Sequence, residues 1–305
     1  MDLFALIAAF GGGVIGAYMG ALPAFIMTGI FALVGGVLTA AGVGGDIAVG
    51  VLAFGSFVGP HISFAGGVAA AGYAGKKGKL SSGTDILSSL NGLGEPDVII
   101  VGGIFGVLGY IISYGIGLLP VIGNAGPATT DLPGITVFIL AIVTRLVFGK
   151  TGLTGKYTGS GNREWFSTGK GFAYNVVLGA GIGIVVSGLA MSLFNSGNTA
   201  AFGIFPIICF GFAAISLIFT QTGFATPATH HIFLPSALAA SAGIQAWGEA
   251  GVLLGILFGI LGSLMGDLVG KTLNSHCDTH IDPPATTIFI LTIIINAIAS
   301  VIVPA

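Results

Sequence analysis

The two halves of the chain repeat the same blocks of sequence in the same order. The stretch DLPGITVFILAI at 131–142 returns as DPPATTIFILTI at 282–293, with seven of twelve positions identical. Three shorter blocks also recur, and they pair FGVLG at 105–109 with FGILG at 258–262, His61-Ile62 with His231-Ile232, and Gly11, Gly13 and Gly20 with Gly179, Gly181 and Gly188. Chance similarity between apolar segments does not explain four ordered matches, so we infer an internal duplication. Duplicated hydrophobic chains are typical of membrane transporters.

The composition indicates whether the surface of the folded chain faces water or lipid. Of the 305 residues, 54% are hydrophobic and only 7% are charged, whereas about a quarter of the residues in a soluble domain are charged. A membrane-spanning helix takes about 20 mostly apolar residues. Ten candidate stretches follow one another along the chain: 3–21, 24–43, 47–75, 97–120, 132–149, 172–194, 201–220, 224–246, 248–270 and 284–304. The sequence therefore predicts an all-α integral membrane protein with about ten transmembrane segments.

The basic residues predict an orientation. With five crossings per half and the N-terminus outside, all nine Lys and Arg residues lie on the cytoplasmic side, as the positive-inside rule requires. An odd number of crossings per half makes the two repeats inverted in the membrane. We expect a first membrane repeat at 1–150, a cytoplasmic linker at 151–171 and a second membrane repeat at 172–305. If segments three and eight re-enter the membrane instead of crossing it, the N-terminus is inside and Lys271 is outside.

The third and eighth segments carry the candidate binding site. Prolines interrupt both, at Pro60 and at Pro227 and Pro235, and they free backbone groups that a bilayer tolerates only beside protein or a water-filled cavity. We expect broken helices or hairpins that meet at the interface between the repeats, where helix N-termini would favour an anion or a carbonyl group. The side chains expected to bind the solute are polar and close to these prolines: His61, Ser63, Thr226, Thr229, His230 and His231. The alternative is a pair of helix kinks whose histidines bond neighbouring carbonyl groups.

Two aspartates precede helix starts that contain proline, Asp131 and Asp282. Aspartate in this place is a typical N-cap that satisfies free N–H groups of the first turn, which is the interpretation we favour. The alternative is a coupling-ion ligand or a gating carboxylate in each half.

The loop NSHCDTHID at 274–282 brings together His276, Cys277 and His280. These side chains are suitable ligands for a divalent transition metal. The first half has no equivalent loop, so a solvated polar turn is the favoured interpretation and a metal site is the alternative.

No motif indicates an enzyme, an organic cofactor or a nucleic-acid partner. The chain has no phosphate-binding loop of the G-x-x-x-x-G-K type, no hydrolase nucleophile elbow and no basic patch. We expect no catalytic activity and no cofactor. The expected partners are the lipid bilayer and a small-molecule or ion substrate, and whether the chain forms a homo-oligomer stays open.

Two segments carry a family resemblance. GPHISFAGGVAAAGYAGKKG at 59–78 and GALPAFIMTGIFALVGG at 20–36 resemble an uncharacterised, largely archaeal family of glycine-rich, multi-pass membrane proteins that are sometimes labelled permease-like. The resemblance implies a membrane location and no particular activity. The expected five-plus-five inverted architecture is also similar to that of ammonium and urea channels, although the flanking motifs of those families are absent.

These observations favour a membrane transporter or channel of the prokaryotic inner membrane. It would move a small polar or anionic solute, passively or coupled to H⁺ or Na⁺, through a site between the repeats. The alternatives are a transition-metal permease that uses the 274–282 loop and a non-catalytic membrane subunit of a larger complex.

Overall fold

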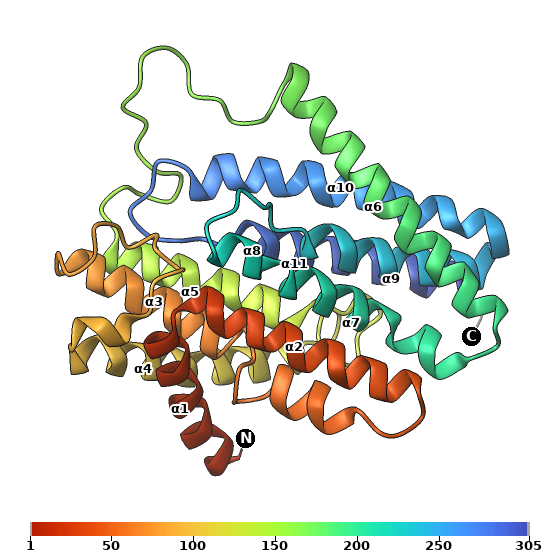
Figure 1. The fold of residues 1–305 in the computed structure, drawn as a ribbon, viewed down its shortest axis with the longest axis horizontal. Coiled ribbons are helices and arrows are strands. Elements are labelled where there is room, and N and C mark those ends of the chain that lie inside the picture. Colours follow the sequence, from red (N-terminus) through yellow and green to blue (C-terminus); the bar gives the residue numbers. More distant parts are fainter. Residues whose placement is uncertain (1, 304–305) are drawn as a thin grey trace.

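The computed structural model describes residues 2–303, which form helices joined by loops with no β-strand among them (Figure 1). The first half contains α1 (Leu3–Met19), α2 (Ala21–Ala40), the π-helical η1 (Ile47–Ala53), α3 (Ser63–Lys76), the 3₁₀ turn η2 (Leu90–Leu93), α4 (Pro96–Gly117) and α5 (Leu132–Phe148). The second half contains α6 (Gly169–Asn195), α7 (Thr199–Ile215), α8 (Leu217–Gln221), α9 (His230–Trp247), the 3₁₀ turn η3 (Gly248–Gly251), α10 (Val252–Val269), the π-helical η4 (Gly270–Asn274) and α11 (Pro283–Ile302).

The helices have the length and apolar character of a multi-pass membrane protein. Six continuous helical segments are long and apolar enough to cross a membrane: Ala21–Ala40, Pro96–Gly117, Gly169–Asn195, Thr199–Gln221, His230–Asn274 and Pro283–Ile302. The fifth of them contains both α9 and α10. The apolar helices α1 and α5 are shorter.

The third and eighth predicted segments are broken. Residues 54–62 are non-helical between η1 and α3, and Pro60 lies in this stretch. In the second half, residues 222–229, with Pro227, are non-helical before α9. Pro235, which we expected to help break the eighth segment, lies inside α9 without ending the helix. Only the C-terminal parts of the two segments are α-helical.

Glycines let the helices of the first half approach closely. Helix α1 packs against α3 and α4, and α3 packs against α4 and α5. A methyl group on Gly13 of α1 would overlap the backbone of Gly102 in α4, and a methyl group on Gly106 would meet the backbone of Gly13. Small residues allow such contacts between membrane helices, so these glycines form a packing seam.

The second half repeats these contacts. Helix α6 packs against α9 and α10, and α9 packs against α10 and α11. In the first half, a methyl group on Gly106 would meet Gly13. In the second half, a methyl group on Gly259, which is equivalent to Gly106, would meet Gly183. Gly181 has no atom nearby that an added methyl group would meet. By these contacts Gly183 corresponds to Gly13, and the sequence pairing of Gly13 with Gly181 is wrong by two residues.

The halves meet along the helix pairs α2–α7 and α5–α11. Helices α2 and α7 are antiparallel, because Gly29 contacts Ala214 while Gly36 contacts Ile208. Their close approach again depends on glycine, since added methyl groups at both positions would press on the other helix.

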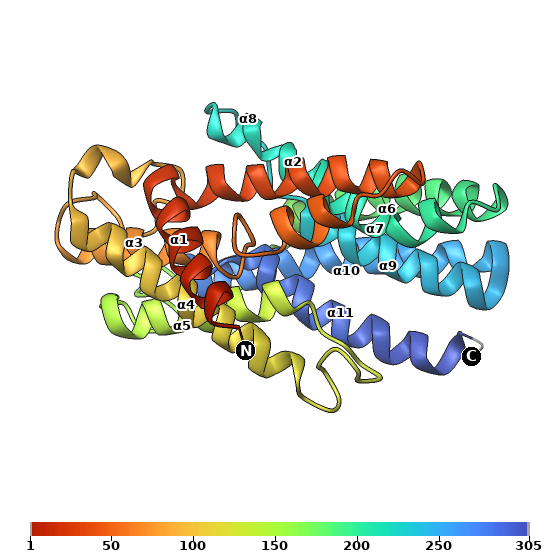
Figure 2. The same cartoon turned by 90° about the horizontal axis from the view of Figure 1, so that it is seen from below.

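Helices α5 and α11 cross near the N-terminal parts of both. The rings of Phe138 and Phe289 contact each other at the crossing, with centroids 5.3 Å apart. The side-chain amide of Asn296 in α11 donates a hydrogen bond of 2.7 Å to the carbonyl oxygen of Thr129, just before α5. From the crossing, the two helices run toward opposite ends of the molecule (Figure 2). Each helix therefore begins inside the protein, beside the other half.

Arg145 joins the loops at one end of the molecule. This α5 side chain is only 1% exposed. Its guanidinium group donates hydrogen bonds to the carbonyl oxygens of Leu153, Leu273 and Thr279, at 2.7, 3.1 and 2.6 Å. It thus ties the central linker to the loop that precedes α11.

The loop after α3 lies at the same end. Gly83 in this loop forms an isolated bridge with Thr279. Nearby, Lys77 pairs with Glu95 at 3.0 Å, and hydrogen bonds from Lys79 and Lys77 lower the pKa of Glu95 below its usual value. The loop after α3, the central linker and the loop before α11 are therefore joined in one layer.

Candidate functional site

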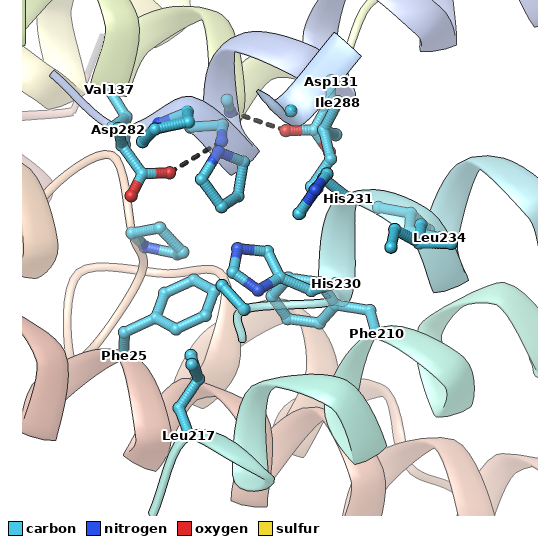
Figure 3. A pocket seen from close by; sticks show the side chains of 18 of the residues that line it. Phe25, Asp131, Val137, Phe210, Leu217, His230, His231, Leu234, Asp282 and Ile288 are labelled. Carbon is cyan, nitrogen blue, oxygen red and sulfur yellow. Dashed lines mark hydrogen bonds between the residues drawn. The ribbon is translucent and has the colours of Figure 1, made fainter. Parts of the chain in front are cut away.

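A cavity of about 620 Å³ lies between the two halves (Figure 3). Helices α2, α3 and α5 of the first half and α6, α7, α9, α10 and α11 of the second contribute to its walls. Most of the lining side chains are apolar, and a few polar ones converge among them. This size and composition are typical of small-molecule sites, which measure about 300–1,000 Å³.

His230 and His231 form the first turn of α9 and line the cavity. The chain reaches them from the non-helical stretch 222–229, and the backbone N–H of Ile232 closes the first turn on the carbonyl oxygen of Thr229 at 2.8 Å. The two histidines are 5% and 8% exposed, and neither Nδ1 atom has a hydrogen-bond partner among the described residues. Because a buried polar atom without a partner is costly, these nitrogens are candidates to bind a solute.

Four phenylalanines form a wall beside His230. The rings of Phe25 and Phe210 meet edge to face, with centroids 5.6 Å apart, and the centroid of Phe25 lies 4.8 Å from that of His230. Phe64 contacts Phe25, and Phe54 contacts Phe210, with centroids 5.7 and 5.5 Å apart. All four rings line the cavity. Figure 3 shows the imidazole of His230 between Phe25 and Phe210.

Asp131 and Asp282 line the cavity and cap the helices that begin there. Oδ1 of Asp131 accepts a hydrogen bond of 2.6 Å from the backbone N–H of Gly134, and Oδ2 of Asp282 accepts one of 2.7 Å from that of Ala285. The predicted N-caps are confirmed. Oδ1 of Asp282 also lies 3.2 Å from Nε2 of His280. The free N–H groups of both helix starts are thus partly satisfied by carboxylates of the chain itself.

Apart from the histidines, the ionisable side chains that stand out in the cavity lining are carboxylates. Asp131, Asp267 and Asp282 line the cavity, and the described part of its wall contains no lysine or arginine. Asp267 accepts hydrogen bonds from the backbone N–H and the hydroxyl group of Ser167, at 2.8 and 2.7 Å. Three carboxylates therefore line the cavity, and the basic side chains among the described lining residues are histidines, of which His280 faces Asp282.

The structure brings together only part of the predicted binding set. Thr226, His230 and His231 line the cavity, whereas His61, Ser63 and Thr229 are not among its lining residues. His61 is buried just before α3, where its carbonyl oxygen packs against Gly109 of α4. The carbonyl oxygen of His231 packs in the same way against Gly262 of α10. The two histidines hold equivalent places, but only His231 lines the cavity.

The side chains proposed as metal ligands point to separate partners. The ring of His276 packs on Tyr157, with centroids 4.9 Å apart, and Nη1 of Arg145 donates to Sγ of Cys277 at 3.0 Å. His280 faces Asp282 instead. Residues 2–303 contain no group of three His, Cys, Asp or Glu side chains placed to hold a metal ion. The turn is only partly solvated, because His276 is exposed whereas His280 is buried, and Arg145 donates a hydrogen bond to the carbonyl oxygen of Thr279.

Sequence analysis missed the aromatic wall and the place of His280. Phe25 and Phe210 lie in uniformly apolar helices, where no polar neighbour distinguishes them from phenylalanines that face lipid. For His280 a signal was present. His280 lies two residues before Asp282, the N-cap of α11. Because α11 begins inside the protein, a side chain so close to its N-cap is also buried.

A second pocket continues from the cavity toward the end of the molecule opposite the basic loops. It shares Gly203, Pro206 and Leu238 with the cavity and extends to Asn198 and Gln245. A methyl group on Gly203 would contact nothing within 4 Å. The space beside Gly203 is therefore open, and the second pocket lies next to the cavity, toward the end where α6 and α7 meet (Figure 1).

Comparison with known proteins places the chain in a family. The sequence profile of one family matches residues 1–167 and 171–304, so the two matched segments are separated within the linker that divides the halves. No curated protein and no solved structure matches the chain significantly. Since the match covers nearly the whole sequence, the chain belongs to this family, which is described as a family of unknown function (DUF7973).

Proposed function

We propose that this chain is a membrane transporter whose solute binds in the cavity between its two halves. The observation that carries this proposal is the pair His230 and His231. Both residues stand at the start of a broken helix and line a cavity built from both halves, and their Nδ1 atoms are buried without a partner among the described residues. Transporters commonly bind their substrates at the interface of two repeats, beside discontinuous helices.

The packing supports an inverted duplication. The contacts among α1, α3, α4 and α5 recur among α6, α9, α10 and α11. The contact of His61 with Gly109 recurs as that of His231 with Gly262. Because α5 and α11 run to opposite ends from their crossing (Figure 2), corresponding helices of the two halves have opposite directions. We therefore assign ten crossings in two inverted sets of five.

The distribution of basic residues supports an N-terminus outside the cell. Lys77, Lys79, Arg145 and Lys271 lie in or beside the loops that Arg145 and the Gly83–Thr279 bridge join at one end. A single basic end is what the positive-inside rule expects of the cytoplasmic face. The second pocket then opens toward the outside, and the solute path leads from it through Gly203, Pro206 and Leu238 into the cavity.

Uptake by the chain alone tests the proposal. Proteoliposomes should take up at least one member of a panel of small organic cations, carboxylates and neutral polar compounds. Gly203→Trp fills the route between the two pockets and should reduce that uptake at least about tenfold. Gly188→Trp places the same side chain on an exposed part of α6 and should leave the uptake unchanged.

The competing assignment is a non-catalytic subunit of a larger membrane complex. If no compound of the panel moves, and the chain co-purifies with a stable partner in fixed stoichiometry, the transporter proposal is refuted in favour of this one. Uptake that Gly203→Trp leaves unchanged would place the path elsewhere in the molecule.

A further inference from the structure

We infer that the cavity recognises an organic cation, namely an ammonium group carried on an apolar or aromatic body. This inference rests on the proposed function, because it names the class of solute that the same cavity binds. It departs from the anion that helix N-termini alone would favour.

The first argument is the charge of the wall. Asp131, Asp267 and Asp282 line the cavity, and its described lining includes no lysine or arginine. Asp282 is buried and faces His280, whereas Asp131 and Asp267 are partly buried. Removing a carboxylate from water is costly unless a cation lies nearby, and a bound cation would offset that cost.

The N-termini of α5 and α11 would attract an anion only if their N–H groups were free. Asp131 and Asp282 already accept hydrogen bonds from Gly134 and Ala285. An anion at either helix start would have to displace a carboxylate or lie beside it. The capping aspartates therefore occupy both helix ends, which present carboxylates to the cavity in place of free N–H groups.

The second argument is the aromatic wall. Phe25, Phe54, Phe64 and Phe210 all line the cavity. The electron-rich faces of aromatic rings attract ammonium groups, and this attraction is strongest where water is excluded. An apolar cavity lined by carboxylates and phenyl rings suits a cation with a hydrophobic body better than a hydrated inorganic ion.

The third argument is the pair of imidazoles. The Nδ1 atoms of His230 and His231 are buried without a partner among residues 2–303, and both residues line the cavity. An unprotonated imidazole nitrogen accepts a hydrogen bond from an ammonium N–H group. The ring of His230, whose centroid lies 4.8 Å from that of Phe25, places an imidazole at the aromatic wall.

Binding of three matched probes to the purified chain in dodecyl maltoside tests the inference by titration calorimetry. The probes are benzylammonium, phenylacetate and benzyl alcohol, which share a benzyl group and differ in charge. We expect benzylammonium to bind at least about tenfold more tightly than either of the others. Phenylacetate binding as tightly as the cation, or no cation binding at all, would overturn the inference.

Charge-neutral variants assign the effect to the cavity. Asp131→Asn and Asp282→Asn each remove one charge and keep a good N-cap, so the folded chain should melt normally and bind the cation about tenfold more weakly. Asp46→Asn makes the same change at an exposed residue before η1 and should have no effect. The inference would be overturned if all three variants bound the cation as tightly as the native chain does. It would also be overturned if all three lost affinity to the same extent. Phe25→Leu supplies a further variant that leaves the caps untouched, and it should weaken cation binding more than benzyl alcohol binding.

The two proposals fail separately. If proteoliposomes move phenylacetate or a neutral solute through the Gly203 route, and the cation neither binds nor moves, the transporter stands and the cation class falls. If the cation binds in the Asp131-dependent manner but no solute moves, the binding site stands and the transport function falls.

Discussion

The carbonyl oxygen of His61 lies so close to Gly109 that a methyl group on this glycine would overlap it. His231 and Gly262 show the same relationship in the second half. In each half, a non-helical stretch leads to a histidine at or just before the start of a helix, and the backbone of that histidine presses on a glycine of α4 or α10. These glycines hold the broken helices in place.

Gly109→Ala should therefore destabilise the protein. The overlapping atom belongs to the backbone, so α3 must move away from α4, and we expect the free energy of unfolding to fall by about 1–3 kcal/mol. Gly115→Ala, in the same helix with no atom near the added methyl group, should be neutral or stabilising, because alanine is the better helix former. Thermal unfolding in detergent measures both, and equal effects of the two substitutions would show that the close contact does not matter.

Gly266→Ala should separate binding from stability. The methyl group would overlap the imidazole of His231, and not its backbone, so the ring can rotate away at little cost to stability. We expect a near-normal melting temperature and an affinity for benzylammonium that is several-fold lower, since the imidazole leaves its place on the cavity wall. Gly262→Ala, which presses on the backbone of His231, should instead lower the melting temperature. If Gly266→Ala binds the cation as the native chain does, the place of the His231 ring is unimportant for binding.

Arg145→Met should loosen the layer of loops at the basic end. It leaves the carbonyl oxygens of Leu153, Leu273 and Thr279 without their donor, and a buried acceptor left unsatisfied costs about 1–3 kcal/mol. Lys156→Met removes the same charge from an exposed position of the linker and is the control. Limited proteolysis should cut the linker of the Arg145 variant much faster, and equal cutting of both variants would contradict this role of Arg145.

Single cysteines should report the orientation of the chain. With five crossings per half, cysteines at Asp46, Asn124 and Asn198 react with an impermeant thiol reagent from outside, and cysteines at Lys77, Asn162 and Ser275 react only from inside. The bridge between Gly83 and Thr279 agrees with this arrangement, because it joins the loops that follow Lys77 and Ser275. Labelling of positions 77 and 275 from opposite sides would exclude the inverted five-plus-five arrangement.

The sequence predicted the helical fold and the positions at which helices break, because both depend on local properties. Apolar length predicts spans, and Pro60 and Pro227 predict non-helical backbone. Pro235 shows the limit of this reasoning. It lies in the second turn of α9, close to the helix start, where few backbone hydrogen bonds are lost.

The sequence predicted half of the cavity and misplaced the rest for a physical reason. Equivalent positions in a duplicated chain do not imply equivalent exposure, and the cavity lies toward the second half, so it includes His231 and leaves out His61. The sequence already contained Asp131 and Asp282. Their negative charge became informative about the solute only when the structure showed no lysine or arginine in the described cavity wall. The phenylalanines required the fold, since nothing local distinguishes a lining ring from one that faces lipid.

Access to the cavity from both sides of the membrane tests the central claim most directly. A single cysteine at Ala228, which lines the cavity just before α9, is placed in a chain carrying Cys209→Ala and Cys277→Ser, and an impermeant cationic thiol reagent is added to right-side-out or inside-out vesicles. A transporter that exposes one site alternately to each side should be modified in both preparations, and benzylammonium should slow both reactions, whereas a control cysteine at the exposed Leu253 of α10 should show no such protection. Modification of the Ala228 position from one side only, or from neither, would contradict the account.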